Sequence, residues 1–158
     1  MKRLVKRVVI LGAVGVVTAW ATAVLAADMG KVIEYRRNVM KAIGAHAADI
    51  VLILKGEVPF GASDILAHAE AINAMSKLVP ALVPPGSGPE AGDTNAKPEI
   101  WQNMDKFKAD AERLQTESAK LVEVAKSGDM KAIGAQVAVL GKEACGACHK
   151  EFRKPLKQ

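Results

Sequence analysis

Aromatic residues and cysteine are scarce in this sequence. Only 4% of its 158 residues are Phe, Trp or Tyr, although 50% are apolar, and there are 2 cysteines. Two cysteines are too few to hold a disulfide-rich scaffold together, and no segment has the low-complexity bias of a fibrous protein. The high apolar fraction excludes a disordered chain, because enough surface can be buried to offset the entropy of ordering. We therefore predict one globular domain whose aliphatic core lacks large flat groups, unless something else supplies one.

The N-terminus combines basic residues with a long apolar run. Four cations lie in the first seven residues, and apolar residues follow from Val8 to Ala27 with only two threonines among them. A basic start, an apolar stretch and small residues at its end are typical of a secretory signal peptide. We predict that residues 1–26 are cleaved off, or one residue more, which leaves 27–158 as a mature domain in the periplasm. An uncleaved membrane anchor is the alternative, since about 20 apolar residues span a bilayer.

The predicted mature domain has almost no net charge. The whole chain carries 22 Lys and Arg against 17 Asp and Glu, a formal net charge of +5. Four of the 22 cations lie in the predicted signal peptide, which has no acidic residue, so 18 cations face 17 anions after cleavage. A domain that binds nucleic acid usually has a basic surplus. We therefore predict that nucleic acid is not a partner.

Apolar residues recur every three or four positions through the rest of the chain, without the alternation that is typical of strands. This spacing predicts amphipathic helices, with apolar stripes over residues 32–54, 65–79, 101–125 and 133–148. Gly56 follows the first helix, and Pro80 bends or ends the second. Pro98 opens the third helix, and Asp129 caps the fourth. Residues 81–97 form a long irregular loop, which either is mobile or covers something. These elements predict an all-α, antiparallel up-down-up-down four-helix bundle.

The two cysteines lie three residues apart in the segment Cys145-Gly146-Ala147-Cys148-His149. This C-x-x-C-H spacing is typical of a c-type haem attachment site. On a helix the two thiols and the imidazole share one face, so each thiol can add to a haem vinyl group while His149 coordinates the iron. We therefore predict one covalent haem c, held by Cys145 and Cys148 and ligated by His149. A buried porphyrin would also explain why aromatic residues are scarce.

Two other roles fit the cysteine pair less well. A redox-active disulfide of this spacing belongs near a βαβ unit, and the chain shows none. A structural zinc site needs further ligands at suitable spacing, and neither His46 nor His68 pairs with another ligand in the sequence. We interpret both histidines as residues at the surface or at the edge of an apolar stripe.

The sequence resembles the class II c-type cytochromes, the cytochrome c′ family, over nearly all of the mature domain. The resemblance rests on segments in the family's order: Tyr35 to Met40, Lys55-Gly56-Glu57, Lys97 to Trp101, and Cys145 to Arg153. It implies the same bundle with the same haem. It also implies that Met40 stands at the position facing His149 across the iron.

The resemblance leaves two states of the iron open. In some relatives the residue that matches Met40 is a methionine that coordinates the iron, which favours a low-spin haem suited to electron transfer. In others the position holds Leu, Tyr, Phe or an unbound Met, and a five-coordinate haem binds NO or CO. We predict electron transfer with a redox partner protein, through iron ligated by His149 and Met40, and gas binding is the alternative. On the bare sequence Met40 also fits an ordinary core residue.

Three arginines and one asparagine are further candidates for contact with the haem. Arg36 lies on the apolar stripe of the first helix, where a cation needs an anion such as a haem propionate, unless it extends from the edge of the stripe to solvent. The resemblance implies that Arg37 and Asn95 touch the haem edge and that Arg153 lines the proximal pocket. Without it, Arg37 and Asn95 would be solvated residues and Arg153 a cation in the last turn of a helix.

The sequence shows no nucleophile–base constellation and no phosphate-binding loop, so we predict that the protein is not an enzyme. Many members of the resembling family are homodimers joined through their first and second helices, so the resemblance allows a homodimer here. No membrane partner is expected after cleavage of the signal peptide.

Overall fold

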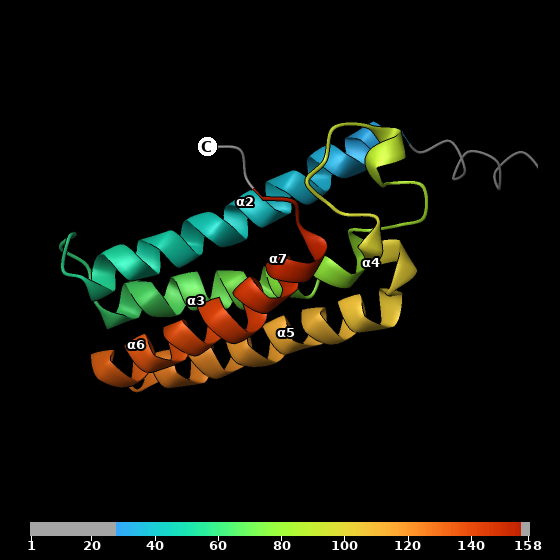
Figure 1. Ribbon diagram of the computed structural model, residues 1–158. Coiled ribbons are helices and arrows are strands. Elements are labelled where there is room, and N and C mark those ends of the chain that lie inside the picture. The colour runs from blue at the N-terminus through green and yellow to red at the C-terminus, as the bar shows by residue number, and fades with distance from the viewer. Residues whose placement is uncertain (1–27, 156–158) are drawn as a thin grey trace, which may run out of the picture.

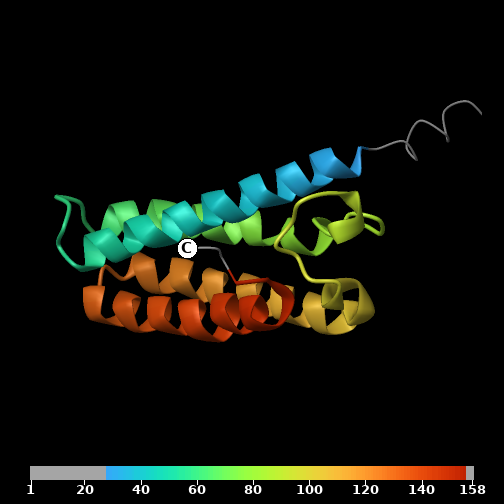
Figure 2. The same ribbon diagram turned by 45° about the horizontal axis from the view of Figure 1, so that its top comes forward.

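The computed structural model of this protein describes residues 28–155, which form four antiparallel helical rods (Figure 1). The rods are α2 (Met29–Leu54), α3 (Ala62–Ser76), α5 (Met104–Lys126) and a last rod made of α6 (Met130–Val139), η4 (Leu140–Gly146) and α7 (Ala147–Phe152). Figures 1 and 2 show that successive rods run in opposite directions. The predicted all-α, up-down-up-down four-helix bundle is confirmed. The predicted signal peptide, residues 1–26, lies outside the described residues.

Short acidic side chains cap two of the helices. Asp28 caps α2, and the Asp129 carboxylate accepts hydrogen bonds from the backbone N–H groups of Lys131 at 2.9 Å and Ala132 at 3.1 Å, as predicted. Gly56 follows α2 with a φ of 69°, a left-handed conformation that glycine adopts at little cost. The start of the last rod is therefore fixed by Asp129, and the end of the first by Gly56.

Replacing Asp129 by Ala is expected to lower the free energy of unfolding by about 0.5–2 kcal/mol, because two N–H groups of the first turn lose their acceptor. Denaturant unfolding of the purified protein measures this change. Glu112→Ala, at an exposed position in the middle of α5, is the control and should alter stability by less than about 0.5 kcal/mol. A variant at Asp129 as stable as the unaltered protein would show that the cap contributes nothing.

Two of the predicted helices end or break earlier than expected. Helix α3 ends at Ser76, because Pro80 has no N–H group to bond the Ser76 carbonyl. The predicted third helix is interrupted, so that α4 (Glu99–Gln102) is separated from α5 by Asn103. The φ of −129° and ψ of 51° at Asn103 are not helical. The prediction of one continuous third helix is therefore wrong at this residue.

The predicted apolar stripes form the core of the bundle. The stripe of α5 is buried at Phe107, Ala111, Leu114, Ser118, Leu121 and Ala125. In α2 the ends of the buried face are shifted by one residue, since Ile33 and Ile53 are buried where Val32 and Leu54 were expected. The buried hydroxyl of Ser118 accepts a hydrogen bond from the Asn73 amide at 3.1 Å, which links α5 to α3.

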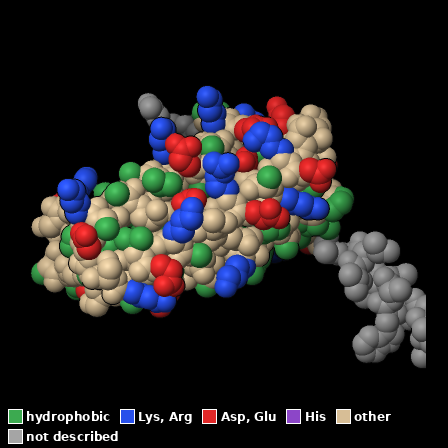
Figure 3. All heavy atoms as spheres, turned by 90° about the horizontal axis from the view of Figure 1, so that it is seen from below, with side chains coloured by type: hydrophobic (Ala, Val, Ile, Leu, Met, Phe, Trp, Pro, Cys, Tyr) green, Lys and Arg blue, Asp and Glu red, His purple; other side chains and the backbone are tan. Residues whose placement is uncertain are grey.

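The surface carries charges of both signs. On the face shown in Figure 3, acidic and basic side chains lie among one another rather than in separate patches. None of the helices in residues 28–155 is long and apolar enough to cross a bilayer.

Candidate functional site

The Cys-Gly-Ala-Cys-His motif lies where the last rod changes its hydrogen-bond pattern. Cys145 is in the π-helical turn η4, whereas Cys148 and His149 are in α7. The predicted uninterrupted fourth helix is therefore wrong at this turn. A Cβ atom at Gly146 would lie only 3.1 Å from the Gly141 carbonyl oxygen, so the turn favours glycine there. Single π turns within helices are frequent at functional sites.

Both thiols of the motif are free, half-buried and protonated at neutral pH. Burial raises the pKa of the Cys145 thiol, and burial together with the Asp110 carboxylate raises the pKa of the Cys148 thiol to about 11. Reactive cysteines of redox proteins show the opposite, a lowered pKa. The environment of the pair therefore disagrees with a redox-active disulfide.

The His149 side chain borders an open pocket of about 400 Å³. Burial, and then the positive charge of Arg153, lower the pKa of His149. A neutral imidazole has a nitrogen lone pair with which to coordinate a metal. Four of the residues that line the pocket are cations: Lys97, Lys150, Arg153 and Lys154.

These residues fit a covalently bound haem. Cys145 and Cys148 offer two neutral thiols on adjoining helical turns, and the next residue, His149, offers a neutral imidazole. The pocket of about 400 Å³ is lined by Gly146 and His149 of the motif, but not by Cys145 or Cys148. Its cationic rim suits the carboxylates that a haem carries.

The chain segment that follows the motif pairs with a segment before α4. Ala96 and Arg153 form an isolated antiparallel bridge, and the Lys154 N–H donates to the Asn95 carbonyl at 2.7 Å. The Lys97 ammonium donates to the carbonyls of Lys150 at 3.2 Å and Glu151 at 3.0 Å, near the end of α7. Asn95 and Arg153, both predicted at the haem, are thus brought beside each other and beside the end of α7.

Arg36 is almost fully buried, with 7% of its surface exposed. Its guanidinium donates to the Leu82 carbonyl at 3.2 Å, to the Ser87 hydroxyl and carbonyl at 3.2 and 2.9 Å, and to the Thr94 hydroxyl at 3.0 Å. Burial lowers the pKa of Arg36, and the Glu90 carboxylate partly offsets this. Arg36 therefore does not extend to solvent, and it binds the loop of residues 82–94. Its contact with a haem propionate stays a prediction.

Trp101 also binds this loop. Its indole N–H donates to the carbonyls of Val83 and Pro84, both at 3.2 Å, and the Arg36 guanidinium carbon lies 5.9 Å from the centre of its ring. A cation at that distance from an aromatic ring is attracted to it. The loop expected either to be mobile or to cover something is therefore fixed at several points.

The other residues predicted on the first helix lie in different environments. Met40 is half-buried and packs against the hydrophobic core, as do Cys145 and Cys148. Arg37 is exposed, as is Asn95. The structure thus groups Cys145, Cys148 and the end of α7, whereas the roles of Met40 and Arg37 toward a haem stay predictions.

Sequence reasoning missed two sets of interactions. The serine and threonine that bind Arg36 lie in a proline- and glycine-rich loop, where only their burial, at 0% and 6% exposed, marks them as structural. The contact between His46 and His68, whose Nδ1 atoms lie 2.8 Å apart, was not predicted. The spacing of 22 residues between them gave no signal of that contact.

Comparison with known proteins gives consistent matches over almost the whole described region. A family model described as Cytochrome C′ matches residues 31–153. Cytochrome c′ of Rhodospirillum rubrum is 36% identical over 150 residues, which cover 94% of this chain and 98% of that protein. Cytochrome c-556 of Agrobacterium tumefaciens is 35% identical over 121 residues, covering 77% and 95%. A solved nitric oxide complex of a mutant cytochrome c prime from Alcaligenes xylosoxidans matches with a TM-score of 0.73 and 28% identity, covering 82% and 98%.

Proposed function

This chain belongs to the cytochrome c′ family and binds one covalent haem c, and we propose that it carries single electrons in the periplasm. The haem supplies an iron that is oxidised and reduced by one electron. The chain's own residues hold that iron and set its ligands. The predicted signal peptide, residues 1–26, is the basis for the proposed location.

Within this proposal, Cys145 and Cys148 form the two thioether bonds and His149 is the first axial ligand. The neutral state of the imidazole supports that role, since burial and Arg153 both disfavour the protonated ring, which has no free lone pair. The cations that line the pocket beside His149 compensate carboxylate charge.

The observation that carries the electron-transfer proposal is the thioether of Met40. This side chain is half-buried on α2 and packs against the same hydrophobic core as the two cysteines. A methionine paired with histidine on haem iron raises the reduction potential and suits electron transfer. We propose that Met40 is the second axial ligand.

A second candidate function is the binding of NO or CO to a five-coordinate haem. It is favoured by the similarity to a solved nitric oxide complex of a cytochrome c prime from Alcaligenes xylosoxidans. In that case Met40 only fills space in the core, as methionine often does.

Replacing Met40 by Ala separates the two functions. If Met40 is a ligand, the unaltered protein has a low-spin optical and EPR spectrum, and Met40→Ala converts it fully to high-spin, because the iron loses its thioether ligand. Met75→Ala is the matched control, since Met75 is also half-buried against the core but lies on α3. A high-spin spectrum of the unaltered protein, with rapid CO uptake after reduction, would overturn electron transfer through Met40 and support gas binding.

A further inference from the structure

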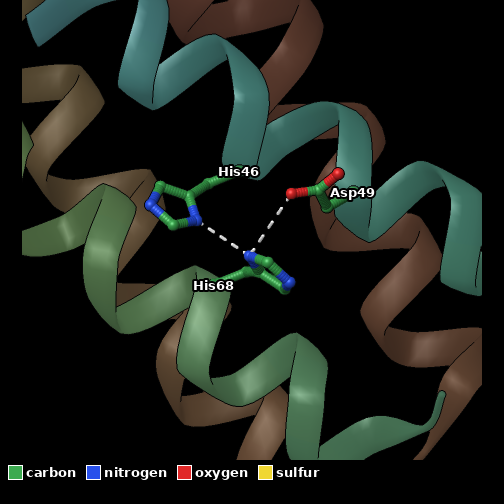
Figure 4. A group of neighbouring side chains, drawn as sticks. All are labelled: His46, Asp49 and His68. Atoms are coloured by element: carbon green, nitrogen blue, oxygen red, sulfur yellow. Dashed lines mark hydrogen bonds and ion pairs between the residues drawn. The ribbon is translucent and has the colours of Figure 1, made fainter.

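Two histidines outside the haem motif meet between α2 and α3. Figure 4 shows the side chains of His46 and Asp49 on α2 and of His68 on α3 directed toward one another. The Nδ1 atoms of the two histidines lie 2.8 Å apart, and His68 Nδ1 lies 3.9 Å from the Asp49 carboxylate. His46 and Asp49 share a face of α2 because they are three residues apart.

A contact of 2.8 Å between two imidazole nitrogens holds a single proton, with one ring donating and the other accepting. When the donor ring adopts its other neutral tautomer, with the proton on Nε2, both Nδ1 lone pairs are free and lie beside a carboxylate. Two imidazoles and one carboxylate are a donor set that zinc and copper ions prefer. The three side chains of the cluster could therefore coordinate a metal ion as well as form a hydrogen bond.

The distances are close to those that a metal ion needs. A zinc–nitrogen bond of about 2.0–2.1 Å in tetrahedral geometry separates two ligand nitrogens by about 3.3 Å. The imidazoles must therefore part by about half an ångström from their present distance of 2.8 Å, and the Asp49 carboxylate, now 3.9 Å from His68 Nδ1, must approach that atom by a similar amount. Side-chain rotation is enough for such shifts, since all three ligand atoms already lie within 4.8 Å of one another.

The accessibility and charge of the cluster also suit a cation. Half of the Asp49 side chain and a quarter of that of His68 are exposed, at 50% and 25%, so an ion can enter from solvent. With neutral imidazoles the three ligands carry one negative charge, which a divalent ion more than compensates. Three protein ligands leave a fourth position for water.

We propose that His46, Asp49 and His68 bind a divalent transition metal ion of the zinc type. The ligands come from two helices, so a bound ion ties α2 to α3 independently of the haem. The absence of thiolates from the cluster favours ions that accept nitrogen and oxygen ligands, such as Zn²⁺ and Cu²⁺, over soft ions.

Calorimetric titration of the haem-loaded protein with Zn²⁺ tests the proposal. The unaltered protein should bind one ion per chain, and His46→Ala and His68→Ala should each weaken binding at least about tenfold, since even outer partners of metal sites contribute that much. His68→Gln is a second variant that keeps a hydrogen-bonding side chain at this position. Glu112→Gln, at an exposed carboxylate on α5, is the control and should bind as the unaltered protein does.

Thermal unfolding gives a second readout. Zinc that binds only the folded state raises the unfolding midpoint of the unaltered protein, and this rise should vanish in His46→Ala and His68→Gln. The haem spectrum should stay the same on zinc addition, which locates the ion away from the haem. Absence of stoichiometric binding, or equal binding and equal midpoint shifts in the histidine variants, would overturn the site and leave an ordinary hydrogen bond between helices.

Discussion

Arg36→Met is expected to lower the free energy of unfolding by on the order of 3 kcal/mol. The substitution removes the donor for two backbone carbonyls and two hydroxyls of the loop 82–94. A buried acceptor left without a partner costs roughly 1–3 kcal/mol, and part of that cost is recovered where water enters. Burial disfavours the positive charge of Arg36 and lowers its pKa. Removing that buried charge therefore reduces the expected loss of stability further.

Arg37→Met is the matched control for this prediction. Arg37 is the next residue on α2 and is exposed, so its substitution should change stability by less than about 0.5 kcal/mol. Denaturant unfolding of the haem-loaded proteins measures both variants. Equal stability of the two would mean that the hydrogen bonds from Arg36 to the loop contribute little in solution.

The double variant Cys145→Ala, Cys148→Ala should lose all covalently bound haem. These are the only 2 cysteines in the sequence, so no other thiol can form a thioether bond. Intact mass spectrometry should give the mass of the unaltered polypeptide plus one haem, and the mass of the bare polypeptide for the double variant. Extraction with acidified organic solvent should then remove haem from the double variant completely and from the unaltered protein not at all.

The single variants refine that result. Cys145→Ala and Cys148→Ala each keep one thiol, so each should retain haem after extraction through one bond. Retention of haem by the double variant would rule out the proposed attachment, as would two unmodified thiols in the natively exported protein. Replacing His149 would not test the covalent attachment, because it changes the iron ligand and leaves both thioether bonds in place.

The sequence predicted the parts of the fold that depend on local pattern. Each rod has an apolar stripe, and burying that stripe stabilises the rod, so the period of three to four residues was enough to locate all four. The cap at Asp129 and the end of α2 at Gly56 were also predicted, because each depends on one residue's own chemistry.

The parts that were missed depend on contacts between distant segments. The break at Asn103 and the π turn that ends within the motif are compatible with the local sequence but not required by it. The partners of Arg36 lie 46 to 58 residues away, in a loop with no periodicity. The contact of His46 with His68 depends on how α2 and α3 lie against each other, which the period of either helix does not specify.

Thr94 joins both ends of the described chain. Its hydroxyl accepts a hydrogen bond from Arg36 on the first helix, and its carbonyl accepts one from the Lys154 ammonium at 3.2 Å, just past the last helix. A movement of Lys154 would thus be transmitted to Thr94, to which Arg36 is also hydrogen-bonded. The beginning and the end of the bundle are therefore coupled through the hydrogen bonds of one threonine.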